Sequence, residues 1–403
     1  MHIAWLGKKS PFCGNVTYGK EITKSLQQRG YQVSFLHFSQ DDEDNNDHDR
    51  SNDDNYLAQV KLPFLYKNQI YTLPAPKSRR VVSETLQKLK PDIVHASLTL
   101  SFLDLALPDI CHQLNIPIVA TFHPPFDRSL RTFKSFTQYL TYIGYSPCLA
   151  HYDKTIVFSE LQRDLLSKLR VPKEKLAIIP NGVDTKKYSP GPSYFKQQYL
   201  TKKLFVYQGR VAWEKNVPSL LKAWKETSMK DYGKLLIMGD GALTPSLKAT
   251  YNENDGVIWL GAIFDEEKRI DILRGCDVFI LPSLVEGLSI SLLEGMACGL
   301  ACVATDAGAD GEVLSGAGIV LDTHNVAKQL KTVLPLFAHH PEISMVLGDK
   351  SRQRVLDKYT LANNVTQLEH LYKQVCGYKF HYPSITKDEE KEKKTINKDI
   401  ISN

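Results

Sequence analysis

The stretch Asp277-Val-Phe-Ile-Leu-Pro282, followed by Glu286-Gly-Leu-Ser-Ile-Ser-Leu-Leu-Glu294, decides the fold of this chain. The first part is a short apolar run, which is typical of a strand buried on both faces of a parallel sheet. The second part opens a helix that we expect to run to Cys298-Gly299, where glycine ends it. A buried strand that leads straight into a helix is the repeating unit of a doubly wound α/β sheet.

The junction between this strand and its helix has the features of an anion site. A helix N-terminus offers unpaired N–H groups and partial positive charge, which suit a bound phosphate. Glu286 and Glu294 flank it with carboxylates that accept hydrogen bonds from sugar and ribose hydroxyls. Gly287, Ser289 and Ser291 are small and leave room for a diphosphate. For either glutamate alone, a capping acid or an exposed helix face is an equally simple explanation. Together these residues predict a nucleotide-sugar site.

The same strand–helix alternation runs through both halves of the 403-residue chain, and this length favours two domains. We therefore expect two Rossmann-like, doubly wound α/β domains that face each other across a cleft. The expected boundaries are 1–187 for the first domain, which faces the acceptor and membrane, and 200–358 for the second, which holds the donor. The helix expected at 359–376 is a candidate to pack back on the first domain. The charged tail 382–403 is expected to be disordered.

Composition narrows the class of protein. Outside the acidic run 41–54, residues 1–190 hold 23 Lys or Arg against 11 Asp or Glu. This excess fits either a solvated surface or attraction to anionic lipid or nucleic acid. The seven cysteines form no CxxC pair, which favours reduced thiols. We expect no transmembrane segment, because no run of 18 apolar residues occurs. We also expect no signal peptide, because the sequence begins directly with the predicted strand Met1-His-Ile-Ala-Trp-Leu6.

Four further loops follow predicted strands, where open α/β sheets bind their ligands. Arg210 and Lys215 lie in one of them, after Gly209, and can converge on one anionic group. Alone, such a basic pair is common on protein surfaces. The other three loops are the glycine-rich 238–242, Thr121-Phe-His123-Pro-Pro125, and 7–15 after the first strand, which contains Gly14 and Asn15.

These motifs, in this order, resemble the large family of retaining glycosyltransferases of GT-B fold. The resemblance covers roughly residues 1–375 and rests on Gly209-Arg210 with Lys215, Asn181-Gly-Val-Asp184, Gly239-Asp-Gly241, and the two glutamates separated by seven residues. Within that family, 11–19 and 121–125 resemble digalactosyldiacylglycerol synthases of the cyanobacterial and red-algal plastid type. Many relatives carry Gly-Gly where this chain has Gly14-Asn15, which puts the contact made by Asn15 in doubt.

The resemblance implies a role for each matching residue. Arg210 and Lys215 would stabilise the departing UDP, Glu286 would bind the sugar and Glu294 the ribose. His123 would contact the donor sugar near its 6-position. The other implied donor contacts are Gly14, Asn15, Gly209, Gly261, Ile263, Gly287, Leu288, Ser289 and Ile290. Because no Asp-x-Asp motif appears where a metal would be needed, we expect no metal and no cofactor, with the basic pair in the metal's place.

The implied reaction moves galactose from UDP-galactose to monogalactosyldiacylglycerol, with retention of configuration. The segment 126–145 supports a glycolipid acceptor: Phe126 and Phe133 lie on an apolar stripe, with Arg128, Arg131 and Lys134 beside it. Such a helix either packs on the core or lies at an anionic membrane surface. The implied location is peripheral, on a plastid or cyanobacterial membrane.

Three other functions stay open from the sequence. A transferase of the same family that uses another UDP- or GDP-sugar, or another acceptor, is the nearest alternative. A sugar-nucleotide epimerase of GT-B fold would share the cleft without needing an apolar, basic acceptor surface. A nucleic-acid-binding protein would account for the positive charge but not for the paired glutamates, and no RNA-binding motif is present, so we expect no nucleic-acid partner.

Overall fold

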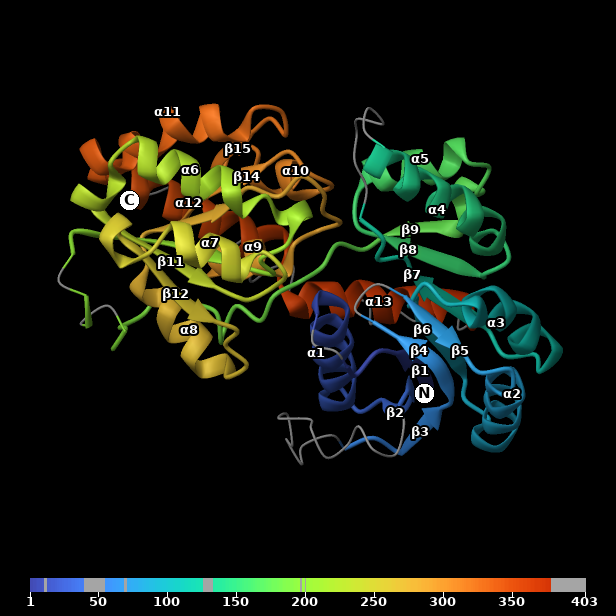
Figure 1. Ribbon diagram of the computed structural model, residues 1–403. Helices are drawn as coiled ribbons and strands as arrows, with labels where there is room; N and C mark the ends of the chain where they lie inside the picture. The colour runs from blue at the N-terminus through green and yellow to red at the C-terminus, as the bar shows by residue number, and fades with distance from the viewer. Residues whose placement is uncertain are drawn as a thin grey trace, which may run out of the picture.

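The computed structural model describes residues 1–10, 13–39, 55–68, 71–125, 133–195, 198–199 and 201–377, and only the backbone of 133–138. Two parallel sheets, each covered by helices, form two units that lie side by side (Figure 1). The expected fold class of two doubly wound α/β domains is confirmed. The acidic run 41–54 and the tail 382–403 lie outside the described residues.

The N-terminal sheet has seven described strands in the order β3-β2-β1-β6-β7-β8-β9, all parallel. The direction of winding reverses between β1 and β6, and open α/β sheets bind ligands at such a switch point. The strands are β1 His2–Gly7, β2 Gln32–Phe38, β3 Ala58–Leu62, β6 Ile93–Ser97, β7 Ile118–Thr121, β8 Lys154–Val157 and β9 Leu176–Ile178. The helices are α1 Gly14–Gln28, α2 Ser78–Leu89, α3 Phe102–Gln113, α4 Phe133–Leu149 and α5 Glu160–Lys168.

An antiparallel hairpin of β4 Phe64–Lys67 and β5 Thr72–Pro74 stands apart from this sheet. The sequence does not predict it, and β3, which leads into it, was also missed. The reason is visible in its burial: the four residues of β4 are partly buried, exposed, exposed and partly buried, so buried and exposed positions do not alternate. A half-buried strand is recognised by that alternation.

The C-terminal sheet has six described strands in the order β12-β11-β10-β13-β14-β15, again all parallel. They are β10 Lys203–Gln208, β11 Gly233–Met238, β12 Val257–Gly261, β13 Val278–Leu281, β14 Ala301–Thr305 and β15 Ile319–Leu321. Their helices are α6 Val217–Glu226, α7 Thr244–Thr250, α8 Glu266–Gly275, α9 Ile290–Ala297, α10 Asp310–Leu314, α11 Val326–His339 and α12 Pro341–Lys358. Every residue of β13 and β14 is buried, as the apolar run at 277–282 predicts.

The last described helix, α13 Leu361–Val375, leaves the C-terminal sheet and packs on α1 of the N-terminal unit (Figure 1). Its buried residues Val365, Leu368 and Tyr372 join the core that contains Ile3 and Trp5 of β1. The chain therefore crosses between the two units twice. The two crossings touch, because Val183 and Thr360 form a parallel bridge.

Because Leu368 is fully buried in this shared core, Leu368→Ala should destabilise the N-terminal unit by roughly 2–5 kcal/mol. Urea unfolding followed by circular dichroism measures the loss. Asn363→Ala, on the exposed side of the same helix, is the matched control and should change stability by less than about 0.5 kcal/mol. Equal stability of the two variants would contradict the packing of α13 on this core.

Candidate functional site

The loop between β13 and α9 is held from behind by the segment that follows β14. The N–H of Ala309 donates to the carbonyl of Gly287 at 2.7 Å. Gly308 has a φ of +58°, and a Cβ there would lie 2.2 Å from the carbonyl oxygen of Glu286. Only glycine allows this approach. The position of the loop is therefore set by backbone contact.

Asp310 completes this support from the start of α10. Its Oδ1 accepts the backbone N–H of Ser289 at 2.8 Å, while the Ser289 side chain caps α9. Burial, and then the neighbouring Glu286, raise the pKa of the Asp310 carboxyl well above its ordinary value. Asp310 was not among the predicted site residues.

Lys215 and Glu286 form an ion pair in which Nζ and Oε1 lie 2.5 Å apart. Lys215 ends a short 3-10 turn after β10, and two hydrogen bonds hold that turn against the β13 loop. The N–H of Leu284 donates to the carbonyl of Glu214 at 2.8 Å, and Asn216 Nδ2 donates to the carbonyl of Pro282 at 3.2 Å. Two residues predicted from separate motifs thus meet in the structure.

Arg210 lies in the same loop as Lys215 but pairs with a different carboxylate. Its Nη2 is 2.8 Å from Oε1 of Glu214, and its side chain is 41% exposed. Both cations of the predicted pair are therefore held by carboxylates. An anionic ligand would have to compete with Glu214 and Glu286 for them.

Three glycines join the carboxyl ends of β10, β11 and β12. The N–H of Gly209 donates to Met238 at 3.0 Å, and that of Gly239 donates to Gly261 at 2.8 Å. A Cβ on Gly239, whose φ is +145°, would lie 1.8 Å from the carbonyl oxygen of Gly209. The loops are packed too closely for any side chain at this position. Ile263, two residues beyond Gly261, has its carbonyl bound by Nη1 of Arg269 at 3.2 Å.

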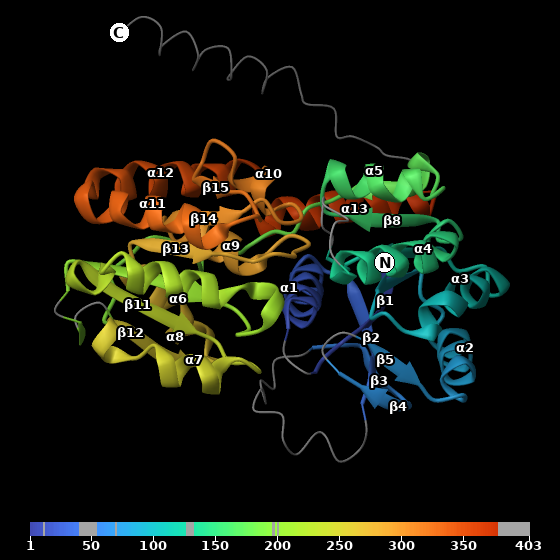
Figure 2. The same cartoon turned by 45° about the horizontal axis from the view of Figure 1, so that its top comes forward.

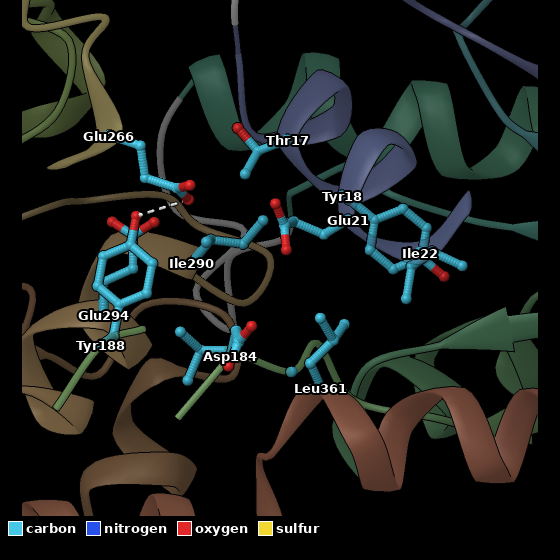
Figure 3. Close-up of a pocket in the computed structure, with 12 residues that line it drawn as sticks. Thr17, Tyr18, Glu21, Ile22, Asp184, Tyr188, Glu266, Ile290, Glu294 and Leu361 are labelled. Carbon is cyan, nitrogen blue, oxygen red and sulfur yellow. Dashed lines mark hydrogen bonds between the residues drawn. The ribbon is translucent and has the colours of Figure 1, made fainter. Parts of the chain in front are cut away.

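Glu294 is buried on α9, and its Oε2 accepts a hydrogen bond from Gln208 Nε2 at 2.6 Å. Burial raises the pKa of the Glu294 carboxyl, and the charge of Arg269 opposes that shift. Figure 3 shows Glu294 beside Tyr188 and Glu266, at one end of a pocket between the two units. The other lining residues are Thr17, Tyr18, Glu21, Ile22, Gly182, Val183, Asp184, Ile290 and Leu361.

His123 follows β7 in the N-terminal unit and belongs to a chain of hydrogen bonds. The hydroxyl of Ser97 donates to Asn15 Oδ1 at 2.7 Å, so it accepts from His123 Nε2 at 2.8 Å. Asn15 Nδ2 in turn donates to the carbonyl of Leu98 at 3.2 Å. Burial lowers the pKa of His123 to about 3, which favours a neutral imidazole that donates through Nε2 in this chain. Ser97 was missed by the sequence reasoning, although its place at the end of β6 was a signal for it.

The two units come into contact at Gly287, the glycine of the loop after β13. A Cβ on Gly287 would lie 3.4 Å from the carbonyl oxygen of His123. Beside it, Asn181 Nδ2 donates to the carbonyl of Leu288 at 2.9 Å. The predicted residues Asn15, His123, Lys215, Glu286 and Gly287–Ser289 are thus brought to one interdomain junction. Glu294 lies one helical turn further along α9, and Gly14 begins α1.

The side chains of the predicted acceptor residues are not described by the structure. Phe126, Arg128 and Arg131 lie outside the described residues. Phe133 and Lys134 begin α4, and their side chains are not described. Within the described ranges, no group of three or more His, Cys, Asp or Glu side chains is arranged to hold a metal ion. No described helix is long and apolar enough to cross a membrane.

Comparison with known proteins identifies the class first. Sucrose-phosphate synthase from Thermosynechococcus elongatus superposes with a TM-score of 0.73 at 19% identity, over 94% of this chain and 100% of that one. Anabaena HepE in complex with UDP-glucose also gives 0.73, at 14% identity over 93% and 100%. These matches show the fold, which is the two-domain GT-B fold of glycosyltransferases.

Family models then match both units of the chain. Residues 14–187 match the model described as Glycosyltransferase Family 4, and 202–339 match that of the Glycosyl transferases group 1. The chain belongs to the group 1 glycosyltransferases of GT-B fold.

Curated relatives share more sequence identity but match over less of the chain. An Escherichia coli UDP-Gal:alpha-D-GlcNAc-diphosphoundecaprenol alpha-1,3-galactosyltransferase is 25% identical over 240 residues, which are 56% of this chain and 59% of that protein. The sulfoquinovosyl transferase of Arabidopsis thaliana is 26% identical over 320 residues, or 73% and 58%. The chain therefore matches less than two thirds of the length of these relatives.

Two histidines of the N-terminal unit, the buried His95 and the partly buried His123, predict a pH dependence of stability. Burial, helped by the charge of Lys8, lowers the pKa of His123 to about 3, and burial lowers that of His95 well below 6.5. The unfolded chain binds these protons near pH 6.5, while the folded protein does not, so stability should fall as the pH falls from 7 to 5. Urea unfolding at both pH values measures this. His123→Gln should lose part of the dependence, and an unchanged dependence would contradict the lowered pKa of His123.

Proposed function

We propose that this protein transfers galactose from UDP-galactose to monogalactosyldiacylglycerol and thereby makes digalactosyldiacylglycerol. The observation that carries the transferase part is the Lys215–Glu286 pair, which lies where the donor loop meets the opposite domain at His123. That junction brings a cation, a carboxylate and an imidazole into one region of the interdomain contact. These are the groups needed to bind a diphosphate and a sugar together.

In the proposed reaction, the donor diphosphate replaces carboxylates as the partner of Arg210 and Lys215. Glu286, released from Lys215, then accepts hydrogen bonds from the sugar hydroxyls. As the bond between the anomeric carbon and the phosphate oxygen breaks, the two cations stabilise the negative charge of the leaving UDP. The departing phosphate accepts the proton of the acceptor hydroxyl on the same face, so configuration is retained without a metal.

The glycolipid acceptor is supported by two observations. Relatives named for lipid-linked or glycolipid substrates include the E. coli enzyme above and an E. coli lipopolysaccharide 1,6-galactosyltransferase, which is 24% identical over 76% of this chain and 80% of its own. The choice of monogalactosyldiacylglycerol rests on the resemblance of residues 11–19 and 121–125. A peripheral location on a plastid or cyanobacterial membrane follows from that acceptor.

A panel of UDP- and GDP-sugars, each with radiolabelled monogalactosyldiacylglycerol, a second glycolipid or a soluble sugar, tests the proposal. Label should enter digalactosyldiacylglycerol from UDP-galactose. Faster transfer from another donor, or to another acceptor, would replace this assignment with a different transferase. Interconversion of the free sugar nucleotide without transfer would indicate an epimerase.

Lys215→Ala should lower turnover by roughly 10²–10³-fold, because it removes a fixed cation from the leaving diphosphate. Steady-state transfer rates measure the effect, and circular dichroism checks that the variant is folded. Lys222→Ala is the matched control, since this lysine is 60% exposed on α6 and forms only a 4.0 Å contact with Glu226. Unchanged turnover in folded Lys215→Ala would exclude the proposed role.

Substitution of the two glutamates should change different kinetic parameters. Glu286→Ala should mainly lower kcat, because its contacts are with the reacting sugar. Glu294→Ala should mainly weaken donor binding, because its contacts are with the ribose. Kinetics as a function of UDP-galactose, with calorimetric binding of UDP, separate the two effects. The reverse pattern would contradict the assignment of the two carboxylates.

A further inference from the structure

The hairpin β4–β5 exposes large apolar side chains to solvent. Leu65 is 63% exposed and Tyr66 50%, and Tyr71 and Leu73 are exposed on the returning strand. The rings of Tyr66 and Tyr71 lie 5.7 Å apart. Single exposed apolar residues are common on soluble proteins, whereas a contiguous group of them marks an interaction surface.

The first turn of α3 continues this surface. Thr72 of the hairpin forms a parallel bridge with Ser101, the residue before the helix, and Phe102 is 70% exposed. Leu105, one turn further, is 41% exposed. Figures 1 and 2 show β5 beside α3, on the N-terminal unit and outside the space between the two units. We call these six side chains the hairpin patch: Leu65, Tyr66, Tyr71, Leu73, Phe102 and Leu105.

The hairpin patch is attached to the loops of the candidate site. Lys67 Nζ donates to the hydroxyl of Ser10 at 2.9 Å, and Lys8 Nζ donates to the carbonyl of Asn68 at 3.3 Å. Lys8 and Ser10 follow β1 and precede α1, the helix that carries Asn15. A surface on which the hairpin rests would therefore lie close to the N-terminal wall of the site.

The charges around the patch are strongly positive. Residues 57–90 contain seven Lys or Arg and one acid, Glu84. Lys77, Arg79 and Arg80 are exposed where the chain leaves the hairpin for α2. Exposed leucines between tyrosines, with basic side chains beside them, match the layered chemistry of an anionic lipid surface: hydrocarbon, interface and headgroup. A nucleic acid would account for the charge but would not need the aliphatic side chains.

We propose that the hairpin patch docks on an anionic lipid bilayer, with Leu65 and Tyr66 entering the interfacial layer and the basic side chains meeting lipid headgroups. This surface differs from the segment 126–145, to which the sequence pointed. It rests on the glycolipid acceptor proposed above, because docking there brings the N-terminal wall of the site to the membrane from which that acceptor comes.

Co-sedimentation with phosphatidylcholine vesicles, with and without phosphatidylglycerol, tests the docking. The full-length chain should bind the anionic vesicles and lose binding at high salt. Leu65→Ser/Tyr66→Ser should weaken binding roughly tenfold or more. Lys77→Gln/Arg79→Gln should weaken it roughly fivefold for each charge removed, on anionic vesicles only. The matched control is Met345→Ser/Val346→Ser, which alters exposed apolar residues on α12 of the other unit and should bind like the wild type.

Two results would overturn the proposal. The first is a failure of vesicle binding to depend on the patch: either the wild-type chain binds neither kind of vesicle, or the hairpin variants bind as well as the wild type. The other is a dimer, seen by analytical ultracentrifugation, that the hairpin variants dissociate, since the patch would then be covered by a second copy. Calorimetric binding of UDP keeps the two proposals separate. Intact UDP binding with lost vesicle binding in Leu65→Ser/Tyr66→Ser supports the patch, whereas vesicle binding without any sugar transfer would overturn only the proposed reaction.

Discussion

The loop from Glu286 to Ser289 is confined on both sides by backbone, and the rest of the candidate site depends on that confinement. Behind it, Gly308 approaches so closely that no side chain fits. In front, Gly287 faces the carbonyl of His123 in the other unit. A loop held in this way presents its carboxylate and its N–H groups without further ordering when a ligand arrives. Preorganisation of this kind lowers the entropic cost of binding.

Electrostatics at the junction follow from that geometry. Glu286 is buried beside Asp310, and two neighbouring carboxylates do not readily share a dry space in the charged form. Lys215 pairs with Glu286, while burial shifts the pKa of Asp310 upward and Asp310 accepts the N–H of Ser289. A diphosphate that draws Lys215 away would leave Glu286 in need of hydrogen-bond donors. In the reaction we propose, sugar hydroxyls would supply them, which would couple the binding of the two parts of a nucleotide sugar.

The sequence anticipates the parts of this arrangement that depend on local pattern. Buried strands such as 278–281, and the loops that follow them, are recognisable from short apolar runs, and this places His123, Lys215 and Glu286 at strand ends. The roles of Asp310 and Ser97 were not predicted, because their partners lie 21 and 82 residues away in the chain. The hairpin β4–β5 was missed for a different reason: its apolar side chains face solvent, so the usual link between hydrophobicity and burial fails there.

The return of α13 to the N-terminal core has a consequence for how the protein is made. On the ribosome, the strands and helices of the first unit emerge well before residues 361–375 do. Until then, the surface of α1 and β1 that receives Val365, Leu368 and Tyr372 lacks its covering helix. Domains usually mature in the order of their synthesis. Here the first domain to be translated is the last to be completed, and the nascent chain must shield an open apolar face while the whole second domain is being built.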